Sequence, residues 1–273
     1  MSDSEHAAAP SPADAIAKAE LLRSLHVPGT PLIVTNVWDA VTARIVAETP
    51  GVKALATASH AVSFAHGVED GEGLTVQQAL AVAELIAHTV DLPVSVDFEK
   101  GYAADAAGVQ ANVEKLIAAG AAGLNIEDSI GADRAPQFAV DVAASRVAAA
   151  RAAGAATGIP VVINARVDTL AGGGDWDEAV TRANAYLDAG ADCIFFLGLS
   201  TEELVERAVA QVRGKISVIA HPGAVPLQRL ADLGISRVSF GPFVLGLTLA
   251  HLRQTTAQLT ALGDYHAELG FQY

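Results

Sequence analysis

The chain contains little cysteine and few basic residues, and both shortages narrow its possible functions. A single cysteine among 273 residues, Cys193, excludes an internal disulfide framework and fits a reducing compartment, so we expect a cytoplasmic location. Seventeen Lys and Arg stand against 31 Asp and Glu, which gives a net charge of −14. Because no basic stripe is visible, the chain is not expected to bind nucleic acid or an anionic membrane surface.

Long uninterrupted apolar runs are also missing. Hydrophobic residues make up 51% of the chain, but much of that share is alanine in helical patterns. The run Val238–Leu252 is broken by glycine and proline and is shorter than the roughly 20 residues that span a bilayer. Residues 1–15 are acidic and rich in Pro and Ala, with no basic n-region, so we expect a disordered tail. Residues 16–273 are then expected to form one domain.

Eight short apolar segments alternate with helical patterns along this domain. The expected strands are Leu32–Asn36, Ala54–Ala58, Val94–Asp97, Gly123–Glu127, Val161–Arg166, Cys193–Phe196, Ile216–Ala220 and Arg237–Phe240. The expected helices are Ala40–Thr49, Thr75–Val90, Ala104–Ala119, Val140–Ala156, Asp175–Ala189, Thr201–Val212, Pro226–Leu233 and Pro242–Leu262. This alternation predicts a (β/α)8 barrel. A doubly wound sheet is the alternative, disfavoured because no GxGxxG turn follows the first strand.

Three of the expected strands end in charged side chains. Val94–Asp97 leads to Asp97 and Glu99, Gly123–Glu127 supplies Glu127, and Val161–Arg166 supplies Arg166. Because the carboxyl ends of parallel strands meet at the ligand-binding edge, we expect these groups to lie together. Carboxylates two residues apart at a strand end share one face, where they repel unless a cation such as Mg²⁺ lies between them.

Several of these residues can also be interpreted as structural or solvent-exposed residues without a role in a site. Glu99 can pair with Lys100 in solvent, Asp128 can cap a turn, and Asp70 in HGVEDGEG can be a turn residue. Cys193 opens an apolar strand and is expected to be a core residue. Asn125 and Asn164 are expected to orient the acids. Among the histidines, His60 and His221 are candidates to touch a ligand, and His6, His26, His88, His251 and His266 are expected at the surface.

The motifs together resemble a known superfamily. NVWDA, ALATAS, HGVEDGE, LPVSVDFEKGY, AAGAAGLNIED, INARVDTL and DAGADCIFF resemble the isocitrate lyase/phosphoenolpyruvate mutase superfamily from about Leu32 to Pro242. The resemblance implies a (β/α)8 barrel whose last helix is exchanged between subunits, in dimers or tetramers. It also implies Mg²⁺ and a small α-oxo or α-hydroxy acid substrate.

The same resemblance implies roles for particular residues. Asp97 matches the direct metal ligand, with Glu99, Glu127 and Asp70 holding the metal mostly through its waters. Arg166 matches the arginine that binds the substrate carboxylate. The remaining substrate-binding residues are expected to be the turn Thr57, Ala58, Ser59 and His60, and Trp38, which either walls the pocket or closes the barrel. The catalytic set is then Asp70, Glu127 and Arg166.

The sequence departs from the family in the segment after the fourth strand, which reads DSIGADRAPQF. Lyases of the family carry a cysteine there as proton donor, and mutases carry lysine and asparagine; neither pattern is present. Tyr102, His60 or water are the remaining candidate donors. We therefore expect cleavage or decarboxylation of a carbon–carbon bond through a pyruvate enolate, with phosphoenolpyruvate–phosphonopyruvate interconversion or other P–C chemistry as the alternative.

Two further alternatives remain open from the sequence. A Schiff-base aldolase needs an interior lysine, for which Lys100 is the sole candidate, and a barrel that only binds an organic acid needs no proton donor. The C-terminal segment has apolar residues on more than one face, including Leu245, Leu249, Leu252, Leu259 and Leu262. Such a helix predicts a partner subunit, and hence a homo-oligomer.

Overall fold

In the computed structural model, which describes residues 11–131, 133–266 and 270, nine parallel strands form one closed sheet. The strands are β1 (Leu32–Val34), β2 (Asn36–Val37), β3 (Leu55–Thr57), β4 (Val94–Asp97), β5 (Gly123–Glu127), β6 (Val162–Val167), β7 (Cys193–Phe196), β8 (Lys215–Ile219) and β9 (Arg237–Ser239). Their order is β1-β9-β8-β7-β6-β5-β4-β3-β2. Since β1 and β2 are two parts of one interrupted strand, the architecture is the predicted (β/α)8 barrel.

The interruption of the first strand closes the barrel. Leu32 of β1 pairs with Arg237 of β9, whereas Asn36 of β2 pairs with Ala56 of β3. The two halves of the first strand therefore pair with the strands on its two sides. The side chain of Asn36 reinforces this junction. Its amide nitrogen donates to the carbonyl of Thr57 at 2.9 Å, and its oxygen accepts from the amide of Phe240 at 2.8 Å.

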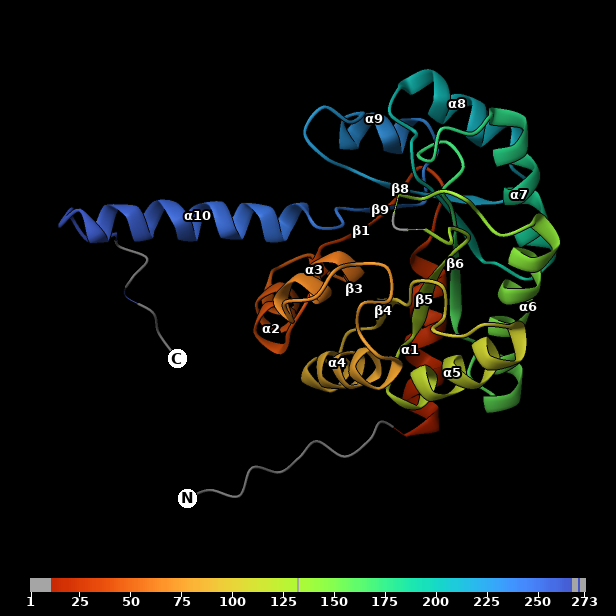
Figure 1. Cartoon of the computed structure of the whole chain (residues 1–273), viewed down its shortest axis with the longest axis horizontal. Helices are drawn as coiled ribbons and strands as arrows, with labels where there is room; N and C mark the ends of the chain where they lie inside the picture. Colours follow the sequence, from red (N-terminus) through yellow and green to blue (C-terminus); the bar gives the residue numbers. More distant parts are fainter. Residues whose placement is uncertain (1–10, 132, 267–269, 271–273) are drawn as a thin grey trace.

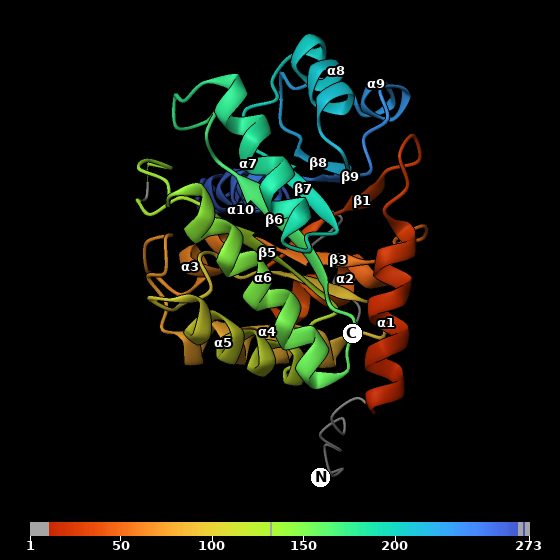
Figure 2. The same cartoon turned by 90° about the vertical axis from the view of Figure 1, so that its right-hand side faces the viewer.

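Helices pack around the barrel, and the last of them extends away from it (Figures 1 and 2). They are α1 (Pro12–Leu25), α2 (Ala40–Glu48), α3 (Ser59–Ala65), α4 (Val76–Thr89), α5 (Ala106–Ala118), α6 (Val140–Thr157), α7 (Trp176–Asp188), α8 (Glu202–Gln211), α9 (Leu227–Asp232) and α10 (Phe243–Thr260). The predicted strands and helices agree with these bounds within two residues. Four of the helices are capped at their start, where the side chains of Thr75, Asp105, Asp175 and Thr201 each accept a hydrogen bond from an amide in the first turn.

Two helices were not expected from the sequence. Residues 1–10 of the predicted tail lie outside the described residues, but residues 12–15 form the first turn of α1, so the predicted end of the tail was wrong. Ser11 caps that turn by accepting from the amide of Asp14, and proline fits the first helical position. The second unexpected helix, α3, begins at Ser59, where the resemblance implied a loop.

The helix α1 lies against one end of the barrel, where the strands begin. Its Leu22 is fully buried and joins a compact apolar cluster with Leu32, Val34 and Val162. His26, at the end of α1, is only 2% exposed, so its expected surface position was wrong. This packing closes the amino-terminal end of the barrel and leaves the opposite, carboxyl-terminal end for a site.

Candidate active site

A cavity of about 90 Å³ lies at the carboxyl ends of the strands. Seven predicted site residues line it: Thr57, Ala58, Ser59, His60, Asp70, Asp97 and Arg166. The lining also includes residues that the sequence analysis did not single out as ligand contacts: Asn36, Asn125, Arg134, Phe195, Leu197, Ile219, Ser239, Gly241 and Pro242. Strand-end residues from across the barrel therefore converge as the topology predicted.

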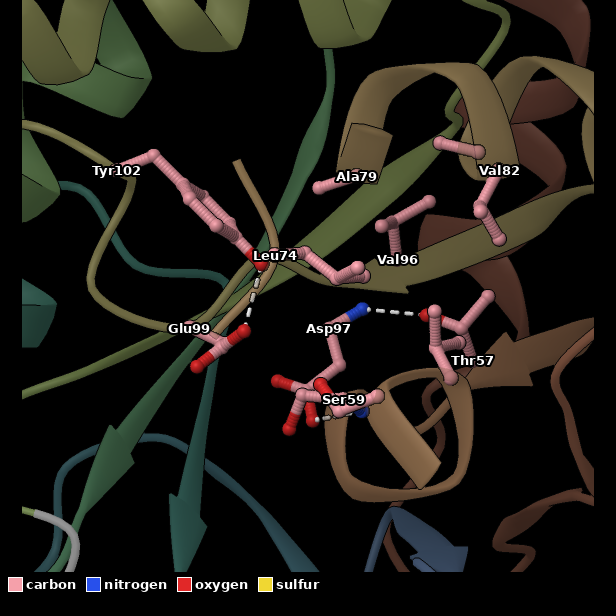
Figure 3. A pocket seen from close by; sticks show the side chains of 12 residues that line it. Thr57, Ser59, Leu74, Ala79, Val82, Val96, Asp97, Glu99 and Tyr102 are labelled. Atoms are coloured by element: carbon pink, nitrogen blue, oxygen red, sulfur yellow. Dashed lines mark hydrogen bonds between the residues drawn. The ribbon is translucent and has the colours of Figure 1, made fainter. Parts of the chain in front are cut away.

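Asp97 is positioned at the end of β4 by contacts from β3 and α3. Its backbone amide donates to the hydroxyl of Thr57 at 2.8 Å, and its Oδ2 accepts from the amide of Ser59 at 3.0 Å (Figure 3). Its other oxygen, Oδ1, is buried and has no hydrogen-bond partner among the described residues. A buried carboxylate oxygen normally has a partner, so Oδ1 is available to a ligand or cation.

Glu99 lies beside Asp97 and is almost fully buried, with 1% of its surface exposed. The hydroxyl of Tyr102 donates to its Oε1 at 2.6 Å, as Figure 3 shows, and the amide of Glu72 donates to its Oε2. Burial raises the pKa of Glu99 to about 7, and the charges of Asp97 and Asp70 add to that shift. The carboxylates of Glu99, Asp97 and Asp70 therefore repel one another. Among the described side chains, Glu99 has no positively charged partner, since Lys100 pairs with Glu72.

Arg166 is held between two acids. Its Nη1 lies 2.5 Å from Oε2 of Glu127, and its Nε and Nη2 both donate to the carboxylate of Asp168 at 2.7 Å. Burial lowers the pKa of Arg166, but the charges of these two carboxylates outweigh burial and raise the pKa well above its ordinary value. The guanidinium is consequently fixed in orientation and permanently charged, with its remaining surface on the cavity.

Asp128 has a structural role and not a place in the cavity. Its Oδ1 accepts from the amide of Asp168 at 3.0 Å, and its Oδ2 accepts from the hydroxyl of Tyr186 at 2.7 Å. Asn125 and Asn164 were expected to orient the acids, but Asn164 donates to the side chain of Asn125 at 2.8 Å. These contacts brace β5 and β6 beneath the site.

Three other expected residues lie outside the cavity lining. Trp38 is 8% exposed and packs with Ala61, Val62 and Leu245 in an apolar cluster. Glu99 and Glu127 do not line the cavity themselves, but each lies beside a residue that does. Glu99 is next to Asp97, and Glu127 forms an ion pair with Arg166.

The lysine required by the aldolase alternative is absent from the described lining, since Lys100 pairs with Glu72 at 3.7 Å. Cys193 is fully buried, and burial raises the pKa of its thiol to about 12, which confirms a core role. His221 is exposed and lines a separate cavity beside α10.

The acids fit a partly hydrated Mg²⁺ better than a fully protein-ligated ion. Among the described residues, no group of three His, Cys, Asp or Glu side chains is arranged to enclose a metal. The free Oδ1 of Asp97 nevertheless faces a region in which Asp70 and Glu99 add negative charge. Mg²⁺ commonly takes one or two carboxylates and completes its shell with water, which is compatible with this arrangement.

Comparison with solved structures identifies close structural relatives. A Burkholderia cenocepacia J2315 protein provisionally named a phosphonomutase is 37% identical, with a TM-score of 0.84 over 88% of this chain and 99% of that one. Oxaloacetate acetylhydrolase in complex with oxalate is 25% identical, with a TM-score of 0.84 over 94% and 91% of the two chains. Both likenesses cover most of this chain.

Sequence relatives point to the same group. The 2-methylisocitrate lyase of Escherichia coli K12 is 34% identical over 176 residues, which cover 63% of this chain and 59% of the lyase. Other relatives are named phosphonopyruvate hydrolase, 29% identical over 213 residues, and oxaloacetate decarboxylase, 29% identical over 224 residues. The family model for phosphoenolpyruvate phosphomutase matches residues 22–260. The chain therefore belongs to the phosphoenolpyruvate mutase family, within the isocitrate lyase/phosphoenolpyruvate mutase superfamily of lyases and mutases.

Proposed function

We propose that the protein is a Mg²⁺-dependent lyase that cleaves or decarboxylates a small α-oxo or α-hydroxy di-acid through a pyruvate-type enolate. The observation that carries the proposal is the buried, unpartnered Oδ1 of Asp97 in a cavity that Arg166 also lines. A cation site and a fixed guanidinium in one small cavity suit a substrate with a carboxylate beside a carbonyl or hydroxyl oxygen.

Each acid has a distinct task in this proposal. Asp97 would hold the ion directly, and Asp70, Glu99 and Glu127 would hold it through water molecules. A bound Mg²⁺ supplies Lewis-acid polarisation of the substrate oxygen that gains negative charge. Arg166 binds the substrate carboxylate, and its pairing with Glu127 and Asp168 prevents it from turning away. Ser59 contributes through its amide, which keeps Asp97 in place.

The enolate must be protonated without a cysteine. Cys193 is excluded by its burial and raised pKa, and the hydroxyl of Tyr102 is already donated to Glu99. His60 lines the cavity, with its Nδ1 3.7 Å from Oδ2 of Asp70. Among the described side chains, His60 is thus the best-placed proton donor, with water as the alternative.

Phosphonate chemistry is the second candidate function, because a phosphonopyruvate hydrolase and a provisionally named phosphonomutase are among the relatives. Against it, the segment after β5 contains no lysine and no asparagine. Phosphorus NMR of phosphonopyruvate incubated with the enzyme separates the two, because only P–C chemistry converts that signal to phosphoenolpyruvate or phosphate.

Substitution of Asp97 tests the proposal. We expect Asp97→Asn to lower Mg²⁺-dependent release of pyruvate from oxaloacetate or another α-oxo or α-hydroxy di-acid by at least about a hundredfold, because losing a group that only supports a metal ligand already costs about 10- to 100-fold. Circular dichroism should show an unchanged fold. Asp91→Asn, at an exposed aspartate, is the matched control and should keep full activity.

The metal requirement has its own test. EDTA should abolish turnover by the wild type, and added Mg²⁺ should restore it. Full activity of Asp97→Asn in EDTA contradicts the metal role, and binding of these acids without turnover of any of them favours a non-catalytic barrel.

We also propose that the protein is a cytoplasmic homo-oligomer in which α10 packs on a partner subunit, as a dimer or tetramer. Within the described ranges, no helix is long and apolar enough to cross a membrane. Figure 1 shows α10 extending away from the barrel, and its Leu247 and Leu252 are 72% and 59% exposed. A partner subunit would cover these side chains.

A further inference from the structure

Two arginines line the active-site cavity, and their surroundings differ. Arg166 is paired with Glu127 and Asp168, whereas the side chain of Arg134 forms no ion pair with any described residue. Arg134 is exposed at the mouth of the cavity. It is therefore the cation of the lining that keeps its donors free for an incoming anion.

The segment that carries Arg134 is anchored at both ends. Ser129 and Gln137 form an antiparallel bridge, and the amide of Phe138 donates to the carbonyl of Asp128 at 2.9 Å. Arg182 of α7 donates to the carbonyl of Phe138 at 2.8 Å. We call residues 128–131 and 133–138 the flap. These bonds hold its two ends against the barrel.

The tip of the flap rests on the segment after β6. A Cβ added to Gly172 would lie 2.5 Å from the carbonyl oxygen of Arg134 and 2.8 Å from the side-chain nitrogen of Gln137. Real Cβ atoms do not approach a backbone oxygen so closely. Glycine at 172 is consequently required for the flap to bring Arg134 to the cavity.

We propose that Arg134 binds the second anionic group of the substrate and so selects di-anionic acids over acids with a neutral tail. The inference rests on the proposed function, because Asp97 and Arg166 are taken to bind the α-oxo acid end. A guanidinium suits a carboxylate or a phosphonate through paired hydrogen bonds, so both kinds of tail are accepted. Gly172 is a positioning residue that acts through Arg134.

Binding of two probes in the presence of Mg²⁺ tests the proposal. Oxalate is short and fills the α-oxo acid end alone, whereas 3,3-difluorooxaloacetate adds a distal carboxylate. By calorimetry, Arg134→Gln should weaken the binding of difluorooxaloacetate by about 10- to 100-fold, the range for a lost charge-assisted hydrogen bond, and leave oxalate nearly unchanged. Arg134→Lys should recover part of the loss.

Matched variants sharpen the test. Gly172→Ala should reproduce the selective loss with the arginine still present, because its Cβ displaces the flap tip. Arg44→Gln, at an exposed arginine of α2, should leave both affinities unchanged. A phosphonate-tailed analogue, phosphonopyruvate, should lose affinity in Arg134→Gln to a similar extent if the tail pocket accepts either anion.

The outcomes separate the two proposals. Equal weakening of oxalate and difluorooxaloacetate in Arg134→Gln, or no weakening of either, overturns the role of Arg134 while the proposed function stands. Failure of the wild type with Mg²⁺ to bind oxalate overturns the proposed function, and the role of Arg134 with it.

Discussion

Asp97 combines two features that rarely occur together in a folded chain. One of its carboxylate oxygens is fixed by the amide of Ser59, and the other is buried without a partner among the described residues. An unsatisfied buried acceptor costs about 1–3 kcal/mol. Such a cost is typical of a functional group that is completed by a ligand, and here Glu99 and Asp70 make a cation the suitable one.

His26 is a second residue whose surroundings disfavour its charged form. Burial is the main reason that its pKa falls to about 3, and the charges of Arg237, Lys215 and Arg23 add to the effect. Its Nδ1 lies 2.7 Å from the carbonyl of Leu22 and acts as the donor in the neutral ring. The folded protein therefore contains a neutral histidine at pH values where the unfolded chain takes up a proton.

This difference predicts a pH-dependent loss of stability. The unfolded state binds a proton below about pH 6.5 and the folded state only below about pH 3, so the free energy of unfolding should fall as the pH drops through that window. The loss from His26 is on the order of a few kcal/mol, since each pKa unit corresponds to about 1.4 kcal/mol. Urea unfolding at pH 8, 6 and 4.5 measures it.

The control for this prediction is His26→Asn, whose amide can still donate to the carbonyl of Leu22 but does not titrate. It should show a shallower fall in stability between pH 6.5 and 4.5 than the wild type. Parallel curves for the two proteins would mean that other groups, and not His26, set the acid sensitivity.

At the residue scale, the sequence predicted that charged residues at the ends of separate strands lie close together. Asp97, Glu127 and Arg166 end apolar strands, and parallel topology alone brings such ends together. Arg134 carried no such signal, because its place depends on a flap folded onto a distant loop. Trp38 packs in an apolar cluster outside the described cavity lining, and a sequence does not tell which side of a short segment faces the cavity.

Among the elements, α1 is the helix whose packing against the barrel the sequence did not indicate. Its Leu22 is fully buried in the cluster that also contains Leu32, Val34 and Val162. A Cβ added to Gly123 would lie 2.7 Å from Leu22, so the strand approaches the helix as closely as glycine allows. The helix thus serves as a plug for the amino-terminal end of the barrel.

Removing part of this plug should destabilise the barrel. Leu22→Ala is expected to lower the free energy of unfolding by about 2–5 kcal/mol, the usual range for a fully buried leucine. Leu21→Ala, next to it but 45% exposed, should cost much less. Thermal and urea unfolding of the two variants checks the difference. Equal, small losses in both would show that α1 does not plug the barrel.

The other elements followed from the alternation of apolar segments with helical patterns, which is a local signal. Strands β4, β5 and β7 have the predicted bounds, and the capping box of α4 at Thr75 and Gln78 marks its start. Two features were missed because they depend on distant contacts. The split between β1 and β2 arises because the two strands pair with different neighbours, β9 and β3. The sequence of α1 resembles the polar, alanine-rich tail before it, and its helix packs through contacts of Leu22 with residues distant in the sequence.

For the molecule as a whole, the apolar surface of α10 is the feature that a single chain leaves unexplained. Phe243, Leu247 and Leu252 are 44%, 72% and 59% exposed on this helix, which extends from the barrel in Figure 1. The start of the helix also borders a cavity of about 420 Å³ lined by Val225, Leu227 and other apolar residues. A net charge of −14 opposes close approach of two copies, so apolar contact must supply the attraction.

Light scattering at micromolar concentration should therefore give a multiple of the single-chain mass of 27.9 kDa. Leu252→Lys should shift the mass toward that of one chain, because it buries a charge in the contact without disturbing a side chain of the barrel core. Gln254→Lys, at an exposed polar position on the same helix, should leave the mass unchanged. A single-chain mass for the wild type would show that α10 remains free in solution.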